Sequence, residues 1–387
     1  MTSILFVDDQ QPALDTLSDW FIKTRPDWQI HVALSAEKAI ALIEQYQIDC
    51  IVSDMSLPGI SGAALVSHVA QYQPDAVRIA LSDSLDDELK LESLHATHRF
   101  INKPESPEKI NTIIDRALSL RARLHEPALR SLITGITSLP VLPEIYDRLM
   151  LELASDSFSV GVVSRIIESD ISLSATLLRI VNTPYYGLVQ HVQSPKHAVN
   201  LLGIELVKNI LLSEKVVTQF KQFNPDAKRI SELNVQSSVR CVLANRFARL
   251  ANLSKRQIDH CQIAGMLSAL GELVVETRMI DPEVLADGPY DHNLIGSSIL
   301  GLWSLPDIVV EAVLHQNDEI APSGEISAVQ VLHTIRILED AFADNHFKLD
   351  EAFSKDTVFH DHPLTDELLF QWFDCFCDYN NDLKLAA

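Results

Sequence analysis

The chain has 387 residues and is long enough for two or three domains, at about 150 residues per domain, that each bury a core. Hydrophobic residues make up 47% and charged residues 22% of an ordinary globular composition, which excludes wholesale disorder and a small disulfide-stapled scaffold. The formal net charge is −22, so the surface as a whole repels a nucleic-acid polyanion, and no basic patch stands out along the sequence.

The cysteines and the start of the chain bear on the cellular compartment. Cys50, Cys241, Cys261, Cys375 and Cys377 are odd in number and lack metal-site spacing, which favours reduced thiols in a core. The first nine residues have no cationic region and end in two acids, so they do not resemble a signal peptide. No apolar run reaches the length of about 18 residues that a membrane-spanning helix needs. We expect a soluble cytoplasmic protein with no membrane partner.

The first 105 residues alternate short apolar runs with segments of helical periodicity. This alternation is typical of βαβ units, in which helices cover both faces of a parallel sheet. The strand candidates are bounded by turn-forming residues and are Ile4–Val7, His31–Ala33, Cys50–Ser53, Arg78–Leu81 and Phe100–Asn102. The pattern predicts a doubly wound, five-stranded α/β domain with its ligand site at the carboxyl ends of the strands, where the strand order reverses.

A helix start at Ser106-Pro107 closes this domain, with Ser106 as the N-cap and Pro107 at the first helical position. The apolar stripe of that helix consists of Ile110, Ile113, Ile114, Ala117, Leu120 and Leu124. Beyond it the pattern becomes amphipathic with few strand signals, which predicts an all-α second domain.

The end of the chain is acidic but too apolar for a disordered tail. Its aromatic residues are Phe347, Phe353, Phe359, Phe370, Trp372, Phe373 and Phe376. We expect this segment to pack as helices on the second domain. The predicted division is therefore a first domain at 1–124, a linker at 125–135 that continues from its last helix, a helical domain at 136–340 and an extension at 341–387.

Three acidic residues follow the ends of two predicted strands. Asp8 and Asp9 come directly after the first strand and Asp54 directly after the third, so the fold brings their carboxylates to one edge of the sheet. Their mutual repulsion favours a bound cation, and oxygen ligands suit Mg²⁺. Ser82 and Lys103, at the ends of the fourth and fifth strands, add a hydroxyl and an ammonium group. Each residue alone could be a turn former, a cap or a surface charge, but the five together predict phosphoryl transfer onto a carboxylate.

Over residues 1–124 this constellation resembles the receiver domain of response regulators, which has a flavodoxin-like fold. The segments that carry the resemblance are Asp8-Asp9, Ile51-Val-Ser-Asp-Met-Ser-Leu-Pro-Gly59, Arg78-Ile-Ala-Leu-Ser82 and Lys103-Pro104. The resemblance implies that Asp54 is the phosphoacceptor and that Lys103 pairs with the phosphoryl group. It also implies that Asp9, Asp54 and the main-chain carbonyl of Ser56 ligate Mg²⁺, with Asp8 acting through water.

The same resemblance implies conformational roles for two further residues. Ser82 moves toward the phosphoryl group, and Phe100, three residues before Lys103, turns inward with it. The Lys103-Pro104 bond is expected to be cis. Asp83 departs from the family pattern, in which a small residue is common. Its carboxylate is expected to repel anionic phosphodonors and to slow both phosphorylation and hydrolysis.

Residues 130–330 resemble an HDOD domain, an HD-like helical bundle and a non-catalytic relative of the His-Asp metal-dependent phosphohydrolases. The matching segments are Leu139–Pro143, Ser169–Gly187, Ser194–Gly203, Ala264–Leu273, Asp291–Gly296 and Trp303–His315. The phosphohydrolases carry their metal-binding His-Asp pair where this chain has Ser268 and Ala269, and His315-Gln316 stands where a His-His pair is common. Alanine cannot ligate a metal and serine is a poor ligand for transition metals. We therefore expect no metal and no catalysis in this domain.

The histidines of the second half of the chain do not change this expectation. His260, His292, His315 and His333 lack the HxxxH and HExxH spacings of metal sites, and each is interpreted as a core or surface residue. His292 and His315 alone could not assemble the three or four ligands that a zinc-type site needs.

We expect a response regulator that is not an enzyme. A sensor histidine kinase or a phosphotransfer protein would phosphorylate Asp54, and the Ile110–Leu124 helix would carry the conformational change to the helical domain. The output would be binding of an unknown downstream protein or self-association, such as a homodimer. Three alternatives remain at this point: a divergent HD-type phosphohydrolase acting on a cyclic dinucleotide, a directly DNA-binding transcription factor, and a receiver that serves only as a phosphate sink. The acidic balance and the lack of a basic helix-turn-helix weigh against DNA binding.

Overall fold

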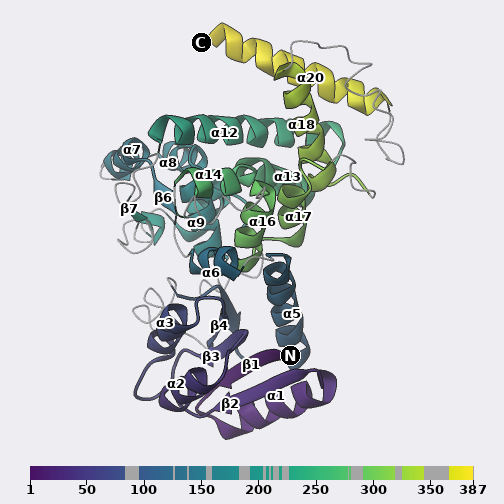
Figure 1. Ribbon diagram of the computed structural model, residues 1–387. Coiled ribbons are helices and arrows are strands. Elements are labelled where there is room, and N and C mark those ends of the chain that lie inside the picture. Colours follow the sequence, from purple (N-terminus) through teal and green to yellow (C-terminus); the bar gives the residue numbers. More distant parts are fainter. Residues whose placement is uncertain are drawn as a thin grey trace.

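Five short strands near the start of the chain form one parallel sheet in the computed structural model, in the order β2-β1-β3-β4-β5 (Figure 1). The structure describes residues 1–82, 96–124, 127–136, 139–153, 159–182, 192–203, 206–208, 211, 218–219, 226–277, 279, 291–318, 325–343 and 366–386. The elements of the first domain are β1 (Thr2–Val7), α1 (Gln11–Thr24), β2 (Trp28–Ala33), α2 (Ala36–Gln45), β3 (Cys50–Asp54), α3 (Gly62–Tyr72), β4 (Val77–Ser82), β5 (Arg99–Asn102) and α5 (Pro107–Arg123). Every predicted strand lies inside an observed one, so the doubly wound sheet is confirmed.

The two faces of the sheet are buried by different helices, because successive strand side chains point to opposite faces. Phe6 of β1 lies in one buried cluster with Phe21 of α1 and Ile114 of α5. The neighbouring Leu5 lies in a second cluster with Leu65 of α3. Strands covered on both faces are expected to contain apolar runs, as β1 does at residues 4–7 and β3 at residues 50–52. The strand order reverses between β1 and β3, which places the switch point where Asp8, Asp9 and Asp54 occur.

The predicted start of α5 is confirmed. The Ser106 hydroxyl accepts a hydrogen bond from the backbone N–H of Lys109, and Pro107 begins the helix. α5 ends at Arg123, because Leu124 has a non-helical backbone with φ −84° and ψ 92°. A separate helix, α6 (Pro127–Gly135), follows. The expected linker thus contains a helix of its own, which starts at a proline that has no N–H to donate to a preceding turn.

Beyond α6 the described part of the chain is mostly helical, as the sequence predicts. Its elements are β6 (Pro140–Val141), α7 (Pro143–Leu153), α8 (Val160–Glu168), α9 (Ile171–Val181), α10 (Pro195–Leu202), β7 (Thr218–Gln219), α12 (Ala227–Leu250), α13 (Lys255–Leu267), α14 (Leu270–Glu276), α16 (His292–Leu302), α17 (Asp307–Leu314), α18 (Ala328–Ala343) and α20 (Asp366–Ala386). β6 and β7 form a two-residue parallel pair that the sequence did not indicate. Among the described helices, none combines the length and the apolar character needed to cross a bilayer.

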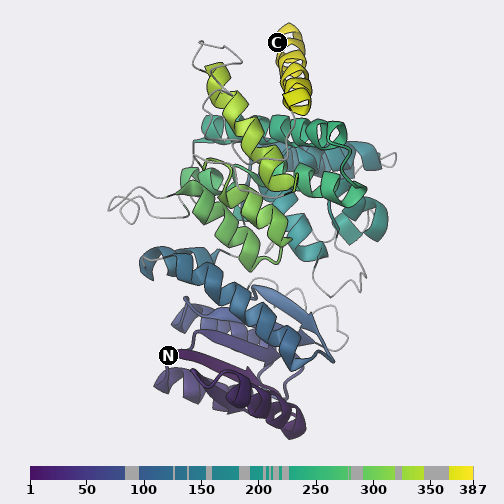
Figure 2. The ribbon, with the colours of Figure 1, turned by 90° about the vertical axis from the view of Figure 1, so that its right-hand side faces the viewer.

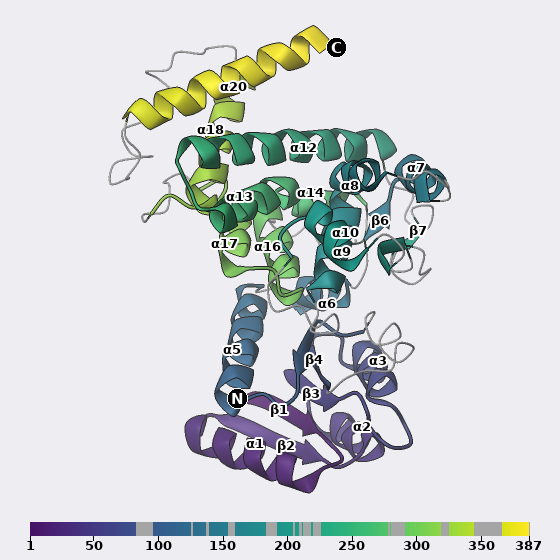
Figure 3. The same cartoon turned by 180° about the vertical axis from the view of Figure 1, so that it is seen from behind.

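The long helix α12 lies along the top of the helical domain, with α13 packed beneath it and α20 at the end of the molecule farthest from the sheet (Figures 1 and 3). Figure 2 shows α5 running from the sheet to the lower side of the helical domain. The buried cluster around α1 and α5 continues into the core of the helical domain, so the two halves share one apolar interior.

The C-terminal helix is attached by an aromatic anchor. Trp372 of α20 is fully buried, and its indole N–H donates to the carbonyl oxygen of Phe247 on α12 at 2.9 Å. The rings of these two residues stack with their centroids 4.9 Å apart. Phe376 packs edge-on against Phe342 of α18. The three aromatic residues predicted at Phe347, Phe353 and Phe359 lie outside the described residues.

Two helices of the helical domain approach so closely that one position requires glycine. A Cβ atom on Gly271 of α14 would overlap the carbonyl oxygen of His292 and lie 2.9 Å from the amide nitrogen of Gly296, both in α16. We expect Gly271→Ala to lower stability by about 1–3 kcal/mol, because the helices must separate. Circular dichroism during heating measures the loss. Gly135→Ala is the matched control, since nothing lies within 4 Å of its added Cβ. Equal unfolding temperatures for both variants would contradict this close approach.

Candidate functional site

The three predicted carboxylates converge at the switch point of the sheet. One oxygen from each of Asp8, Asp9 and Asp54 lies within 4.8 Å of the others. Asp8 and Asp54 are only 2% and 3% exposed, whereas Asp9 is open to solvent. This spacing allows one cation to contact all three carboxylates, and an all-oxygen ligand set is the kind that Mg²⁺ prefers. Within the described ranges no other group of three or more His, Cys, Asp or Glu side chains has such spacing.

Lys103 lies between the two buried carboxylates. Its Nζ is 2.6 Å from Asp8 Oδ2 and 2.7 Å from Asp54 Oδ2. Partial burial on its own would lower the pKa of Lys103, but the hydrogen bonds and charges of Asp54 and Asp8 outweigh it and raise that pKa above its usual value. The ammonium group is therefore held charged beside Asp54. The peptide bond between Lys103 and Pro104 is cis, as predicted.

The backbone around Asp54 is fixed by short-range contacts. Asp54 Oδ1 accepts the N–H of Ser56 at 3.1 Å, and Asp8 Oδ1 accepts the N–H of Gln10 at 2.9 Å. A Cβ atom on Gly62 would overlap the carbonyl oxygen of Asp54 and lie 2.7 Å from Cα of Met55. Glycine at position 62 therefore lets α3 begin directly against the end of β3. The sequence analysis did not single out this residue, although a glycine at a helix start next to a site was a usable signal.

The two predicted switch residues are placed differently. Ser82 is the last residue of β4 and pairs with Asn102 of β5, but its side chain lies outside the described part of the structure. Phe100 is half-buried and packs against a small cluster that includes Met55 and Ala80. Asp83, the predicted departure from the family, also lies outside the described residues.

A buried polar cluster joins β4 and β5 to the start of the helical region. The guanidinium of Arg78 donates to the carbonyl oxygens of Ala96, at 2.5 Å, and of Thr134 in α6, at 2.7 Å. Arg78 is fully buried, and this burial lowers its pKa to about 10. The ring of His98 lies in the same cluster, with Nε2 2.7 Å from the oxygen of Thr134. The sequence analysis placed Arg78 in a strand and in a matching segment but gave it no role, although an arginine inside an apolar strand indicates a special contact.

Two more contacts cross between the domains. Nη2 of Arg179 in α9 donates to the carbonyl oxygen of Thr97, which precedes β5, at 2.8 Å. Arg116 of α5 donates to the carbonyl oxygen of Leu305 at 2.9 Å and forms an ion pair with Asp307 at the start of α17. The face of the sheet domain that carries β4, β5 and α5 is therefore the face in contact with the helical domain.

The position of the missing His-Asp pair is occupied by a hydrogen-bonded network. The Oγ of Ser268 accepts from Nη1 of the buried Arg240 at 3.1 Å and donates to the carbonyl oxygen of Gly265 at 2.8 Å. Arg240 in turn pairs with Glu339 of α18, with Nε 3.0 Å from both carboxylate oxygens. A fixed guanidinium at this point opposes the binding of a metal cation.

The candidate histidines are not gathered into one site within the described ranges. His260 and His333 are buried, and Nε2 of His260 lies 3.5 Å from Nε2 of Gln193. His292 is exposed at the start of α16. Nδ1 of His315 lies 2.7 Å from Oδ2 of Asp318.

Comparison with known protein families agrees with this division of the chain. Residues 4–115 match the model of the response regulator receiver domain, and residues 139–285 match that of the HDOD domain. Among curated relatives, the chain is 24% identical over 231 residues to an uncharacterized protein of Treponema pallidum, covering 54% of this chain and 44% of the relative. It is also 24% identical over 215 residues to the uncharacterized protein YuxH of Bacillus subtilis, covering 55% of this chain and 45% of the relative. The chain thus spans less than half the length of both relatives.

Among solved structures, the MmoQ response regulator of Methylococcus capsulatus is 18% identical. The superposition covers 61% of this chain and 98% of that one, with a TM-score of 0.47.

The interface histidine provides a test of the buried cluster. Nδ1 of His98 accepts the backbone N–H of Arg78 at 3.0 Å, so the ring hydrogen is on Nε2 and points to Thr134. Burial, followed by the charge of Arg78, lowers the pKa of His98 well below its ordinary value. As the pH falls, His98 therefore takes up a second ring proton in the unfolded chain before it does so in the folded chain. The free energy of unfolding decreases as the pH drops below about 6.5.

We expect the stability of the wild type relative to a His98→Gln variant to fall by about 1 kcal/mol between pH 7.5 and 5.5. The free energy of urea unfolding at the two pH values gives this difference, and the comparison with the variant cancels the other titrating groups. A difference between the two proteins that stays constant with pH would show that the pKa of His98 is the same in the folded and the unfolded chain, which would contradict the buried, neutral ring.

Proposed function

We propose that this chain, which carries a response regulator receiver domain followed by an HDOD domain, is a signalling protein switched by phosphorylation of Asp54. The observation that carries the proposal is the position of Asp54. Its carboxylate is buried and paired with Lys103 at one edge of a sheet whose β4, β5 and α5 contact the helical domain. A change of charge at Asp54 is therefore made on β3, which pairs directly with β4, one of the elements that contact the second domain.

The chemistry is transfer of a phosphoryl group from a sensor histidine kinase or a phosphotransfer protein. A carboxylate oxygen of Asp54 bonds to phosphorus as the phosphorus–nitrogen bond of the donor histidine breaks, and the bond electrons remain on the imidazole nitrogen. Lys103 is close enough to Asp54 to contact the new phosphoryl oxygens. The carboxylates of Asp8, Asp9 and Asp54 lie close enough together to hold an Mg²⁺ ion, which would neutralise charge on the phosphoryl group. The main-chain carbonyl of Ser56 would be a further ligand, as the resemblance to receiver domains implies.

Phosphorylation of Asp54 would also disturb the ion pairs of Lys103 with Asp8 and Asp54. Lys103 bridges Asp8 and Asp54 in this structure, and a phosphoryl group on Asp54 adds negative charge that competes for the same ammonium. Ser82 and Phe100 lie on the two strands that lead from this site toward Arg78 and His98. A shift of β4 and β5 would displace Thr134 of α6, because the side chains of Arg78 and His98 both contact its carbonyl oxygen.

The output is proposed to be binding rather than catalysis. The support is the hydrogen-bonded network at Ser268. Arg240 donates to the hydroxyl of Ser268 and pairs with Glu339, and Gln316 donates to the carbonyl oxygen of Ser268. Alanine at position 269 offers no ligand atom. A helical domain of this kind would act by binding a downstream protein or a second copy of the chain, and its location in the cytoplasm is part of this proposal.

The first test is phosphorylation with radiolabelled acetyl phosphate. The wild type should incorporate label in the presence of Mg²⁺ and none in excess chelator, and Asp54→Asn should abolish it. Asp9→Asn should slow labelling roughly 10-fold or more, because a metal-binding carboxylate is lost. Asp19→Asn, which removes an exposed carboxylate of α1, is the matched control and should label normally. Undiminished labelling of Asp54→Asn would refute the assignment of the phosphoacceptor.

The second test asks whether phosphorylation of Asp54 changes the structure or dynamics of the helical domain. Amide hydrogen exchange, followed by mass spectrometry, is compared with and without acetyl phosphate. We expect phosphorylation to change exchange in α6 and at the start of α17, because both elements are bonded directly to the sheet domain.

The same comparison in Asp54→Asn should show no change. Exchange differences confined to the phosphorylated pocket would instead favour a receiver that acts as a phosphate sink.

A further inference from the structure

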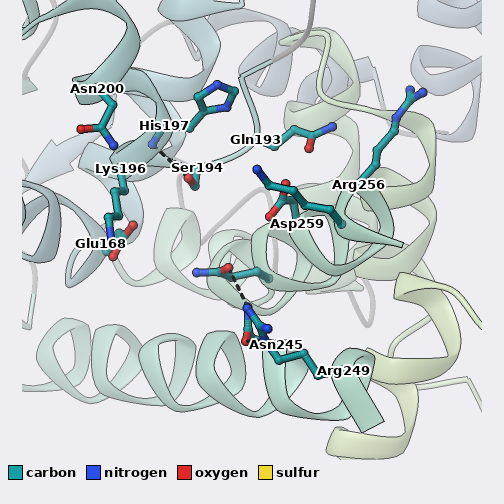
Figure 4. A pocket seen from close by; sticks show the side chains of 12 residues that line it. Glu168, Gln193, Ser194, Lys196, His197, Asn200, Asn245, Arg249, Arg256 and Asp259 are labelled. Atoms are coloured by element: carbon teal, nitrogen blue, oxygen red, sulfur yellow. Dashed lines mark hydrogen bonds between the residues drawn. The ribbon is translucent and has the colours of Figure 1, made fainter. Parts of the chain in front are cut away.

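A polar pocket lies in the helical domain, away from the receiver site and from the network at Ser268. It has a volume of about 1030 Å³ and lies between the end of α8 and the helices α10, α12 and α13. Figure 4 shows side chains from these elements around one space, with Asn245 and Arg249 rising from α12. The lining residues are Glu168, Gln193, Ser194, Lys196, His197, Asn200, Asn245, Arg249, Lys255, Arg256, Asp259 and Gln262.

The charge of this pocket is opposite to that of the chain. Four cationic side chains, those of Lys196, Arg249, Lys255 and Arg256, face two carboxylates, an excess of two positive charges in a chain of net charge −22. Among the described residues, none of the four cations forms a close ion pair with a carboxylate, although the charges of Lys255 and Arg249 act on Asp259 and that of Lys196 acts on Glu168. Two carboxylates cannot neutralise four cations, so a bound anion would relieve the repulsion that remains.

The uncharged groups of the pocket are partly positioned in advance. Nε of Arg249 donates to Oδ1 of Asn245 at 2.8 Å, and Nδ2 of Asn245 donates to Oε1 of Gln262 at 3.1 Å. This row of side chains holds the Arg249 guanidinium at the pocket. Amides such as Gln193 and Asn200 can donate and accept hydrogen bonds, which suits a ligand that carries a heterocyclic base or a sugar as well as an anionic group.

We propose that this pocket binds a nucleoside phosphate. The volume lies at the upper end of the range of about 300–1,000 Å³ that is usual for small-molecule sites. The cations supply contacts for the phosphate, and the four amide side chains supply contacts for the base and the ribose. A nucleic-acid strand is disfavoured, because the net charge of −22 opposes the approach of a long polyanion, whereas a small ligand meets only the local field of the pocket.

The two carboxylates of the pocket oppose such a ligand and supply a further test. Glu168, at the end of α8, lies beside Lys196 (Figure 4). Burial raises the pKa of Glu168, while the backbone N–H and the charge of Lys196 act in the other direction. Glutamine at position 168 would remove the negative charge and still accept the Lys196 N–H. A site for an anion therefore predicts tighter binding when Glu168 is replaced by glutamine.

The test is isothermal titration of the full chain with GMP, with ATP, with inorganic phosphate and with a single-stranded RNA of 20 nucleotides. We expect one nucleotide bound per chain, at least tenfold weaker binding in the Lys255→Glu/Arg256→Glu double variant, and severalfold tighter binding in Glu168→Gln. Lys255 and Arg256 are exposed in the first turn of α13, where acidic residues are favourable, so the double variant should fold. Circular dichroism of both variants checks this.

The matched control is Lys228→Glu, which reverses an exposed charge in the first turn of α12, at the opposite end of that helix from Arg249. It should bind the nucleotide as the wild type does. The proposal is overturned if neither nucleotide binds, if binding survives the double variant, or if Lys228→Glu weakens binding equally. It is also overturned if inorganic phosphate binds as tightly as the nucleotides, or if RNA binds more tightly than they do. Because the titration needs no phosphorylation, its result is independent of the function proposed for Asp54.

Discussion

The buried guanidinium of Arg78 forms the hydrogen bonds that connect the sheet domain to α6 at the start of the helical region. Arg78 lies near the start of β4, fully buried, and its side chain donates to main-chain carbonyl oxygens on both sides of the domain boundary. Taking such a cation out of water costs several kcal/mol unless its hydrogen bonds are satisfied. The buried cation is therefore stable only while the carbonyl oxygens of Ala96 and Thr134 accept its hydrogen bonds. This requirement holds α6 against β4 and the segment before β5 at the domain boundary.

The receiver site depends on a balance between repelling carboxylates and one ammonium group. Parallel strands bring their carboxyl ends to one edge, and this chain places carboxylates there at Asp8, Asp9 and Asp54. The repulsion between Asp8 and Asp54 is offset by one ammonium group, that of Lys103, which contacts both. In the proposed switch, a phosphoryl group on Asp54 and a divalent cation would each compete with these two ion pairs of Lys103. The junction at Arg78 lies on the same strand as Ser82, four residues away.

The helical domain uses its charged residues in two contrasting ways. At Ser268 a buried arginine, Arg240, is neutralised by Glu339 and donates a hydrogen bond to the serine hydroxyl. Between α10, α12 and α13 the cations instead lie open at a pocket and form no close ion pair with a carboxylate among the described residues. The first arrangement stabilises the core, and the second leaves charge available for a ligand.

The sequence by itself determined the doubly wound sheet, the helical second half and the composition of the receiver site. These follow from local rules: apolar strands of four to six residues, a capped helix start at Ser106, and residues that directly follow strands, whose place in a parallel sheet is set by the chain direction. The contacts of Arg78 with Thr134, the close approach of Gly271 to α16 and the pocket lined by Lys196 and Arg249 were decided only by the tertiary structure. Each depends on residues that are distant in sequence, and no local pattern reports which helix faces will meet across a buried interface.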